Sequence, residues 1–157
     1  MPAREYELAT GNLLMGRFTW IYIYVPEGWS VKLGDAPADV NYTSVVKGVG
    51  WVLDGSSSYY VVNLVGGEVV ELDLRCRKGV RNPGLLKEGF EASTVNGHNC
   101  FIGNRTVKRG LRRKLLTQST LTIPCPETSR TIEAKFTSGS APAVEELKKL
   151  FPRYRCH

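Results

Sequence analysis

The chain has 157 residues, of which 42% are hydrophobic and 23% are charged, and its formal net charge is +6. This balance is typical of a globular protein and excludes an intrinsically disordered one. The length fits one domain, residues 1–157, with an ordinary hydrophobic core. No window approaches the roughly 18 apolar residues of a membrane span, and the N-terminus has no signal-peptide pattern. These features predict a cytoplasmic protein without a membrane partner.

Residues 18–25 carry the strongest strand signal. They read FTWIYIYV, which is β-branched or aromatic nearly throughout and apolar on both faces, as in a central strand covered on both sides. Pro26-Glu27-Gly28 ends this strand with residues typical of a turn. The same reasoning predicts further strands over residues 6–10, 29–33, 42–53, 59–65, 70–77, 90–102, 115–123 and 131–136.

Glycines predict where these strands are interrupted or reversed. Gly48 and Gly50 interrupt the strand over residues 42–53 and indicate a bulge or a close approach of the backbone. Gly66-Gly67 lies between two strand-like runs and fits a two-residue hairpin turn. Gly103-Asn104 predicts a turn that leads into the following basic stretch.

A helix is predicted near the C-terminus, over about residues 141–151. Ser140 suits its N-cap, Pro142 is tolerated in the first turn, and Pro152 stops it. We therefore predict an α+β fold, with a central, mostly antiparallel β-sheet and a C-terminal α-helix packed on one face. Apolar residues in these elements give the predicted core: Trp20, Ile21, Tyr22, Ile23, Trp51, Leu72, Leu74, Leu121, Ile123, Ile132, Phe136, Leu147 and Leu150.

Positive charge is concentrated in one segment. Residues 92–126 contain no Asp or Glu, and their stretch 105–114 holds six cations, a charge equal to the net +6 of the whole chain. Lys and Arg make salt-sensitive, sequence-independent contacts to phosphate groups, which favours nucleic acid or another polyanion as a ligand. A solvated basic face and a protein-binding surface are the alternatives. The predicted polyanion-binding residues are Arg105, Lys108, Arg109, Arg112, Arg113 and Lys114.

The cysteines and histidines allow three interpretations. A metal site formed by His98, Cys100, Cys125 and Cys156 is one, although these spacings match no standard zinc module. A disulfide that joins Cys156 to Cys125, or to another strand cysteine, is the second. It would pin the C-terminus to the sheet and stabilise the fold by about 3–4 kcal/mol in the chain-entropy model. Buried thiols with a purely structural role are the third.

No catalytic signature accompanies these residues. The chain has no phosphate-binding glycine loop, no dinucleotide-binding glycine motif and no paired-histidine metalloprotease motif. On one regular strand, His98 and Cys100 would lie about 7 Å apart, too far for a hydrogen bond between a nucleophile and its base. We therefore expect a protein that is not an enzyme and that uses no cofactor.

Several local sequences together resemble small uncharacterised proteins of hyperthermophilic archaea. They are Gly97-His98, the run CPETSR at residues 125–130, and Cys156-His157 at the end of the chain. A low content of Met, with 2 residues, and of Gln also favours a thermophile. This resemblance implies no function.

A second resemblance is to the Mog1/PsbP-like domains. Like them, the chain runs from an early strand that ends in a Pro-x-x-Trp turn, here Pro26-Glu27-Gly28-Trp29, through a meander to a C-terminal helix. The resemblance implies an antiparallel sheet between helices and an accessory or binding role.

The sequence therefore predicts a non-enzymatic binding or accessory protein that contacts nucleic acid or a ribonucleoprotein through a basic hairpin at residues 105–114. One alternative is a Mog1/PsbP-like module that binds a protein or a small ligand in a cleft on the sheet face. The other alternative is a metal-binding protein that uses the His and Cys set.

Overall fold

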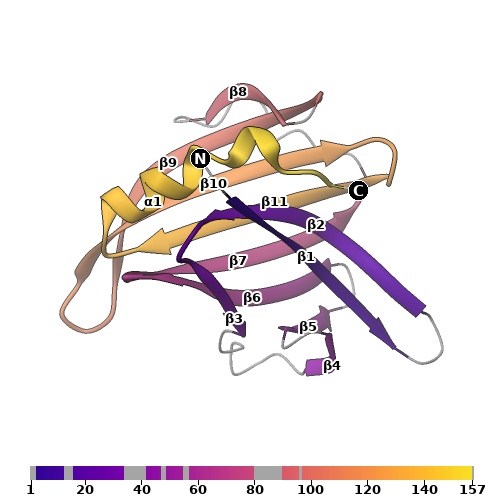
Figure 1. Ribbon diagram of the computed structural model, residues 1–157, viewed down its shortest axis with the longest axis horizontal. Helices are drawn as coiled ribbons and strands as arrows, with labels where there is room; N and C mark the ends of the chain where they lie inside the picture. The colour runs from indigo at the N-terminus through magenta and orange to yellow at the C-terminus, as the bar shows by residue number, and fades with distance from the viewer. Residues whose placement is uncertain are drawn as a thin grey trace.

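The computed structural model of the protein describes residues 3–12, 16–33, 42–46, 49–54, 57–79, 90–95 and 97–156. These residues form an α+β fold, as predicted (Figure 1). The elements are β1 (Ala3–Asn12), β2 (Gly16–Pro26), β3 (Ser30–Leu33), β4 (Tyr42–Val46), β5 (Val49–Asp54), β6 (Ser57–Gly66), β7 (Glu68–Lys78), β8 (Phe90–Val95), β9 (His98–Arg109), β10 (Lys114–Cys125), β11 (Arg130–Ser138), α1 (Ala141–Lys148) and the 3₁₀ helix η1 (Phe151–Arg153).

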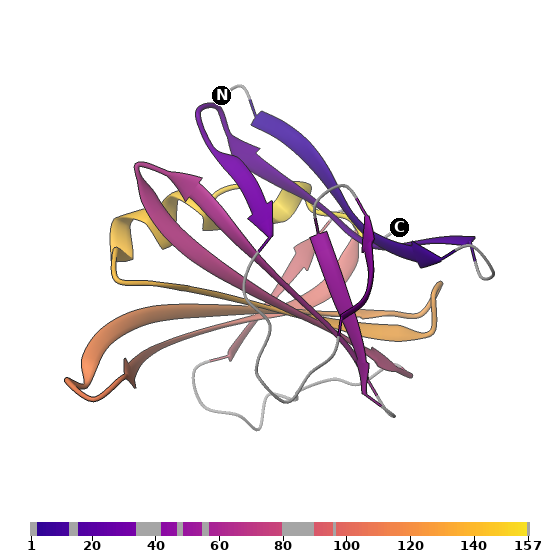
Figure 2. The same ribbon diagram turned by 90° about the horizontal axis from the view of Figure 1, so that it is seen from below.

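The strands form one large and one small antiparallel sheet. The large sheet has the order β4-β5-β6-β7-β11-β10-β9-β8, with β3 paired to β6, and the small sheet pairs β1 with β2. In Figure 2, α1 and the β1–β2 hairpin lie on the same side of the large sheet. The predicted central antiparallel sheet with a C-terminal helix on one face is therefore confirmed.

The core lies between the large sheet and this covering layer. Along β7, Val70, Leu72 and Leu74 are fully buried and alternate with charged residues, because successive side chains of a strand point to opposite faces. Phe136 of β11 lies opposite Leu72 and is itself fully buried. Ten predicted core residues are buried: Ile21, Ile23, Leu72, Leu74, Leu121, Ile123, Ile132, Phe136, Leu147 and Leu150. The side chains of Trp20 and Trp51 lie outside the described residues.

The position of β2 differs from the prediction of a central strand. It belongs to the two-stranded sheet, with Ile21 and Ile23 in the core and Tyr22 half-buried on the other face. The guanidinium carbon of Arg155 lies 4.1 Å from the centre of the Tyr22 ring. A tyrosine can face water when a cation covers its ring, so an aromatic run does not require burial on both sides.

The helix begins where the sequence indicates and ends earlier. The Ser140 hydroxyl accepts a hydrogen bond from the backbone N–H of Ala143 at 3.3 Å, which confirms the N-cap. The predicted end at residue 151 is wrong, because α1 stops at Lys148 and the chain continues into η1. Pro152 disfavours α-helical geometry in the residue before it. Within the described part of the chain, no helix is long and apolar enough to cross a membrane.

The structure differs from two predictions based on glycines. The interrupted strand predicted over residues 42–53 is two strands, β4 and β5, that pair with each other, and Gly48 lies outside the described residues. Gly103 and Asn104 do not turn the chain but continue β9. A Cβ at Gly103 would lie 3.0 Å from the ring of Phe90 on β8, so glycine serves close packing between strands here.

Tyr154 offers a test of the core. Its side chain is fully buried against Phe136 and Phe151, and its hydroxyl has no hydrogen-bond partner among the described residues. Burial raises the pKa of this phenol. An unsatisfied buried hydroxyl destabilises a fold, so Tyr154→Phe should leave the free energy of unfolding unchanged or raise it by about 1 kcal/mol. Urea unfolding measures this change, and a loss above about 1 kcal/mol would show a missing hydrogen bond.

Candidate functional site

The β9–β10 hairpin changes from buried to exposed along its length. In β10, every residue from Gln118 to Cys125 is buried, whereas Lys114 and Leu115 are exposed. Both figures show the distal end of this hairpin extending past the neighbouring strands and α1 (Figures 1 and 2). We call residues 105–114, the distal part of the hairpin with its turn, the basic arm.

The structure places all six predicted polyanion-binding residues on the basic arm. Strand pairing puts Arg109 directly opposite Lys114, and Lys108 opposite Leu115, while Arg112 and Arg113 lie in the turn. The structure therefore confirms that the predicted basic stretch lies at the end of a hairpin. The two strands are longer than the predicted ranges 90–102 and 115–123, because β9 continues to Arg109 and β10 starts at Lys114.

Arg105 fixes the base of the arm. Its Nε donates to Oε1 of Gln118 at 2.8 Å, and Nε2 of Gln118 donates to the Thr137 hydroxyl at 2.9 Å. Gln118 and Thr137 are buried, so these bonds tie Arg105 to a rigid part of the sheet. The other five cations lie further from the core along the hairpin.

The charges of the basic arm are poorly compensated. Arg109 and Lys114 are like charges in directly opposed positions, an arrangement that destabilises a sheet. Arg109 of the arm forms an ion pair with Glu71, with 3.4 Å between Nη1 and Oε1. Both side chains of this pair are more than one-third exposed, so the pair contributes little to stability.

The turn of the arm combines cations with an exposed apolar side chain. Arg113 donates its backbone N–H to the carbonyl of Gly110 at 3.0 Å, and both residues have positive φ, 49° and 83°. Glycine adopts this geometry without steric cost, which explains Gly110. The turn holds Leu111 fully in solvent, with a relative exposure of 106%.

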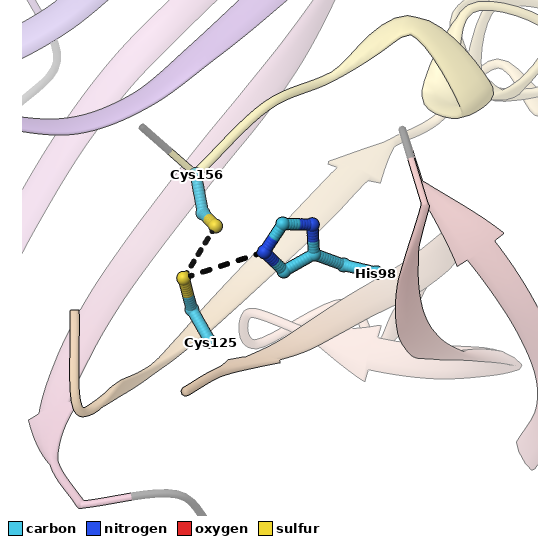
Figure 3. Close-up of side chains that lie close together, drawn as sticks. All are labelled: His98, Cys125 and Cys156. Atoms are coloured by element: carbon cyan, nitrogen blue, oxygen red, sulfur yellow. Dashed lines mark hydrogen bonds between the residues drawn. The ribbon is translucent and has the colours of Figure 1, made fainter. Parts of the chain in front are cut away.

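The opposite end of the same hairpin carries a cluster of sulfur and nitrogen atoms. His98 begins β9, Cys125 ends β10, and Cys156 comes from the C-terminal segment after η1. Nε2 of His98 lies 3.7 Å from Sγ of Cys125, which lies 2.6 Å from Sγ of Cys156 (Figure 3). These three atoms all lie within 4.8 Å of one another. We call these residues the His–Cys cluster.

Glu127 borders this cluster and was not predicted from the sequence. Its Oε2 lies 2.9 Å from Nε2 of His98 and 3.7 Å from Sγ of Cys125. The pKa of its carboxyl is lowered, first by a hydrogen bond from its own backbone N–H and then by His98. The only sign in the sequence that Glu127 lies near the cluster is its position two residues after Cys125. This sign is not specific, because surface carboxylates are common.

The structure corrects part of the predicted cysteine set. Cys100 is fully buried but does not belong to the group of ligand atoms that lie together. Burial raises the pKa of its thiol to about 11, and the hydrogen bond with Ser93 acts in the opposite direction. Burial, together with neighbouring Cys125, raises the pKa of Cys156 to about 12.

The predicted disulfide of Cys125 and Cys156 is not confirmed by the structure and stays a prediction. Their sulfur atoms lie 2.6 Å apart, beyond the S–S bond length of about 2.05 Å. Cys156 was also predicted to lie next to Cys125 on the sheet, and the structure confirms this contact. His157 lies outside the described residues.

The chain was compared with protein families, with curated proteins and with solved structures, and none of the three comparisons finds a match. The basic arm and the His–Cys cluster are therefore the two candidate functional features of the described residues.

Proposed function

We propose that the protein is a nucleic-acid-binding module that contacts duplex phosphates through its basic arm. The observation that carries this proposal is a hairpin end that extends past the neighbouring strands and holds six cations and no acidic residue (Figure 1). Phosphate contacts from such residues supply affinity without sequence readout.

The unfavourable charge arrangement supports a ligand. Arg109 and Lys114 lie opposite each other and repel, and the ion pair of Arg109 with Glu71 is too exposed to offset much of this repulsion. A line of phosphates offers the missing negative charge to both strands of the hairpin.

The shape of the arm also supports this ligand. Residues 105–109 extend for about 15 Å at the usual strand rise. The major groove of DNA is about 12 Å wide and accepts a two-stranded β-ribbon. Leu111, fully exposed at the end of the arm, supplies an apolar side chain of the kind that contacts thymine methyl groups in the same groove.

The test removes three cations from the arm. We expect Arg109→Gln, Arg112→Gln and Arg113→Gln together to weaken binding to a short DNA or RNA duplex at least about tenfold at low salt, because three phosphate contacts are lost. The matched control replaces three exposed cations elsewhere, Lys32→Gln, Lys149→Gln and Arg153→Gln, and changes the net charge equally. Fluorescence anisotropy measures both affinities, and circular dichroism checks the fold.

Two results would contradict the proposal. Unchanged binding by the arm variant would show that the arm makes no phosphate contact. An equal loss in the control variant would show that attraction follows net charge and not the arm. A single strand of the same length serves as competitor, and we expect it to compete less well, because the arm has no aromatic residue for base stacking.

A further inference from the structure

The His–Cys cluster has the atoms of a metal centre. We propose that His98, Cys125 and Cys156 bind one Zn²⁺ ion at the base of the β9–β10 hairpin, with Glu127 as the fourth ligand. This site is independent of the proposed nucleic-acid contact, which lies at the other end of the hairpin.

The distances fit a tetrahedral site. Zinc binds cysteine sulfur at about 2.3 Å and histidine nitrogen at about 2.0–2.1 Å, so ligand nitrogen and sulfur atoms lie about 3.6 Å apart. Nε2 of His98 and Sγ of Cys125 lie 3.7 Å apart, with both atoms directed towards the same point (Figure 3). The two sulfur atoms, at 2.6 Å, must separate by about 1 Å to bind the same ion.

The ligand set selects zinc by its chemistry. Two thiolates and an imidazole are the ligands of structural and catalytic zinc sites, and hard ions such as Mg²⁺ and Ca²⁺ prefer oxygen. The ligands come from β9, β10 and the C-terminal segment, so they are assembled by the fold and not by a short motif. This explains why the spacing in the sequence matches no standard zinc module.

Glu127 completes the coordination from the solvent side. The sulfur atoms are buried, with Cys125 at 0% and Cys156 at 3% exposure, whereas the Glu127 side chain is 57% exposed. Its Oε2 already contacts His98 and Cys125, at 2.9 Å and 3.7 Å. Glu127 is not in the group of ligand atoms that lie within 4.8 Å of one another, so its carboxylate must move towards that group to place an oxygen on an ion held by the other three side chains.

The ion would attach the end of the chain to the sheet. The C-terminal segment is held next to β2 by a backbone bridge between Tyr22 and Arg155, with hydrogen bonds of 2.8 and 3.1 Å. Cys156 follows this bridge directly and lies against the last residue of β10. A zinc ion would therefore fix both the C-terminal segment and the end of the hairpin opposite the basic arm.

The test measures zinc binding by the full chain, kept reduced and freed of metal with a chelator. We expect one Zn²⁺ per chain in a titration against a chromophoric chelator, and thiolate-to-metal absorption when Co²⁺ replaces Zn²⁺. Cys125→Ser and Cys156→Ser should each weaken binding at least about hundredfold, and Glu127→Gln about ten- to hundredfold. Cys100→Ser is the matched control, because this buried cysteine lies outside the cluster, and it should bind like the unaltered chain.

Three results would overturn the proposal. They are the absence of stoichiometric zinc binding by the reduced chain, unchanged affinity in both cluster variants, and a mass showing that Cys125 and Cys156 are joined as a disulfide under reducing conditions. If a cysteine variant does not fold, His98→Gln tests the site, since this side chain lies at its partly exposed rim. Zinc binding by that variant with unchanged affinity would equally overturn the proposal.

Discussion

Replacing Phe136 by alanine should lower the free energy of unfolding by about 3–5 kcal/mol. Phe136 lies on β11 in the middle of the large sheet and is fully buried. Its ring centre lies 5.0 Å from that of Phe151 and 6.4 Å from that of Tyr154. Truncation therefore removes aromatic contacts between the sheet and the C-terminal segment and leaves a cavity that neighbouring strands cannot close.

Thermal and urea unfolding measure this effect. For a domain of this size, the expected loss corresponds to a decrease in Tm of about 10 °C. Val69→Ala is the control, since this side chain lies on the same sheet but is 53% exposed, and its truncation should change stability by less than about 0.5 kcal/mol. A loss below about 1 kcal/mol in Phe136→Ala would contradict the placement of this ring in the core.

Gly66→Ala should destabilise the fold by about 2–3 kcal/mol through a steric clash. A Cβ at Gly66 would lie 2.3 Å from the indole of Trp29, closer than any real contact. Trp29 is itself buried at 8% exposure, and its indole N–H donates to Glu146 of α1 at 3.4 Å. The added methyl group must displace an indole that links the β6–β7 hairpin to the helix.

A double-mutant cycle separates this clash from a general effect on the strand. In a Trp29→Leu background, Gly66→Ala should cost less than about 1 kcal/mol, because the smaller side chain leaves room for the methyl group. Gly139→Ala is the control, since a Cβ there meets only ordinary contacts, of 3.6 Å and longer. Equal losses in both backgrounds would show that Trp29 does not pack on Gly66.

Periodicity predicted the parts of the fold in which one face of an element is buried. Leu72 and Leu74 on β7, and Leu147 on α1, recur at strand or helix spacing because their elements meet the core along one side. The position of the β1–β2 hairpin beside α1, in the layer opposite the large sheet, was not predicted (Figure 2). β1 and β2 are held in this layer by packing against residues distant in the sequence. No local sequence pattern distinguishes a strand in this layer from a strand in the centre of a sheet.

The basic arm shows a second limit. The charge of the arm was evident from the composition. The strands of the arm were not evident, because an exposed strand does not need to alternate apolar and polar residues. Pairing continues to Arg109 and Lys114 because β10 is anchored by the buried residues from Gln118 to Cys125. These buried residues set the register between β9 and β10. The pairing of the two strands therefore continues into a stretch whose sequence resembles a loop.

The His–Cys cluster was predicted in part. His98 and Cys125 flank the same hairpin, so their meeting follows from strand pairing, and Cys156 was expected to pack on the sheet. Cys100 was included because it follows His98 at a spacing that shares a strand face, but it lies outside the group of ligand atoms. Glu127 was missed because the turn after β10, which brings it back to His98, leaves no pattern in the sequence.

The contact between the basic arm and nucleic acid can be measured through the dependence of duplex affinity on salt concentration. Each phosphate contact contributes about 0.9 to the slope of log affinity against log salt concentration. We predict a negative slope for the unaltered chain whose magnitude falls by about two to three units when Arg109, Arg112 and Arg113 are replaced by glutamine, and does not fall as far in the Lys32, Lys149 and Arg153 control. Equal slopes in the arm variant and the unaltered chain would contradict the assignment of the basic arm as the nucleic-acid contact.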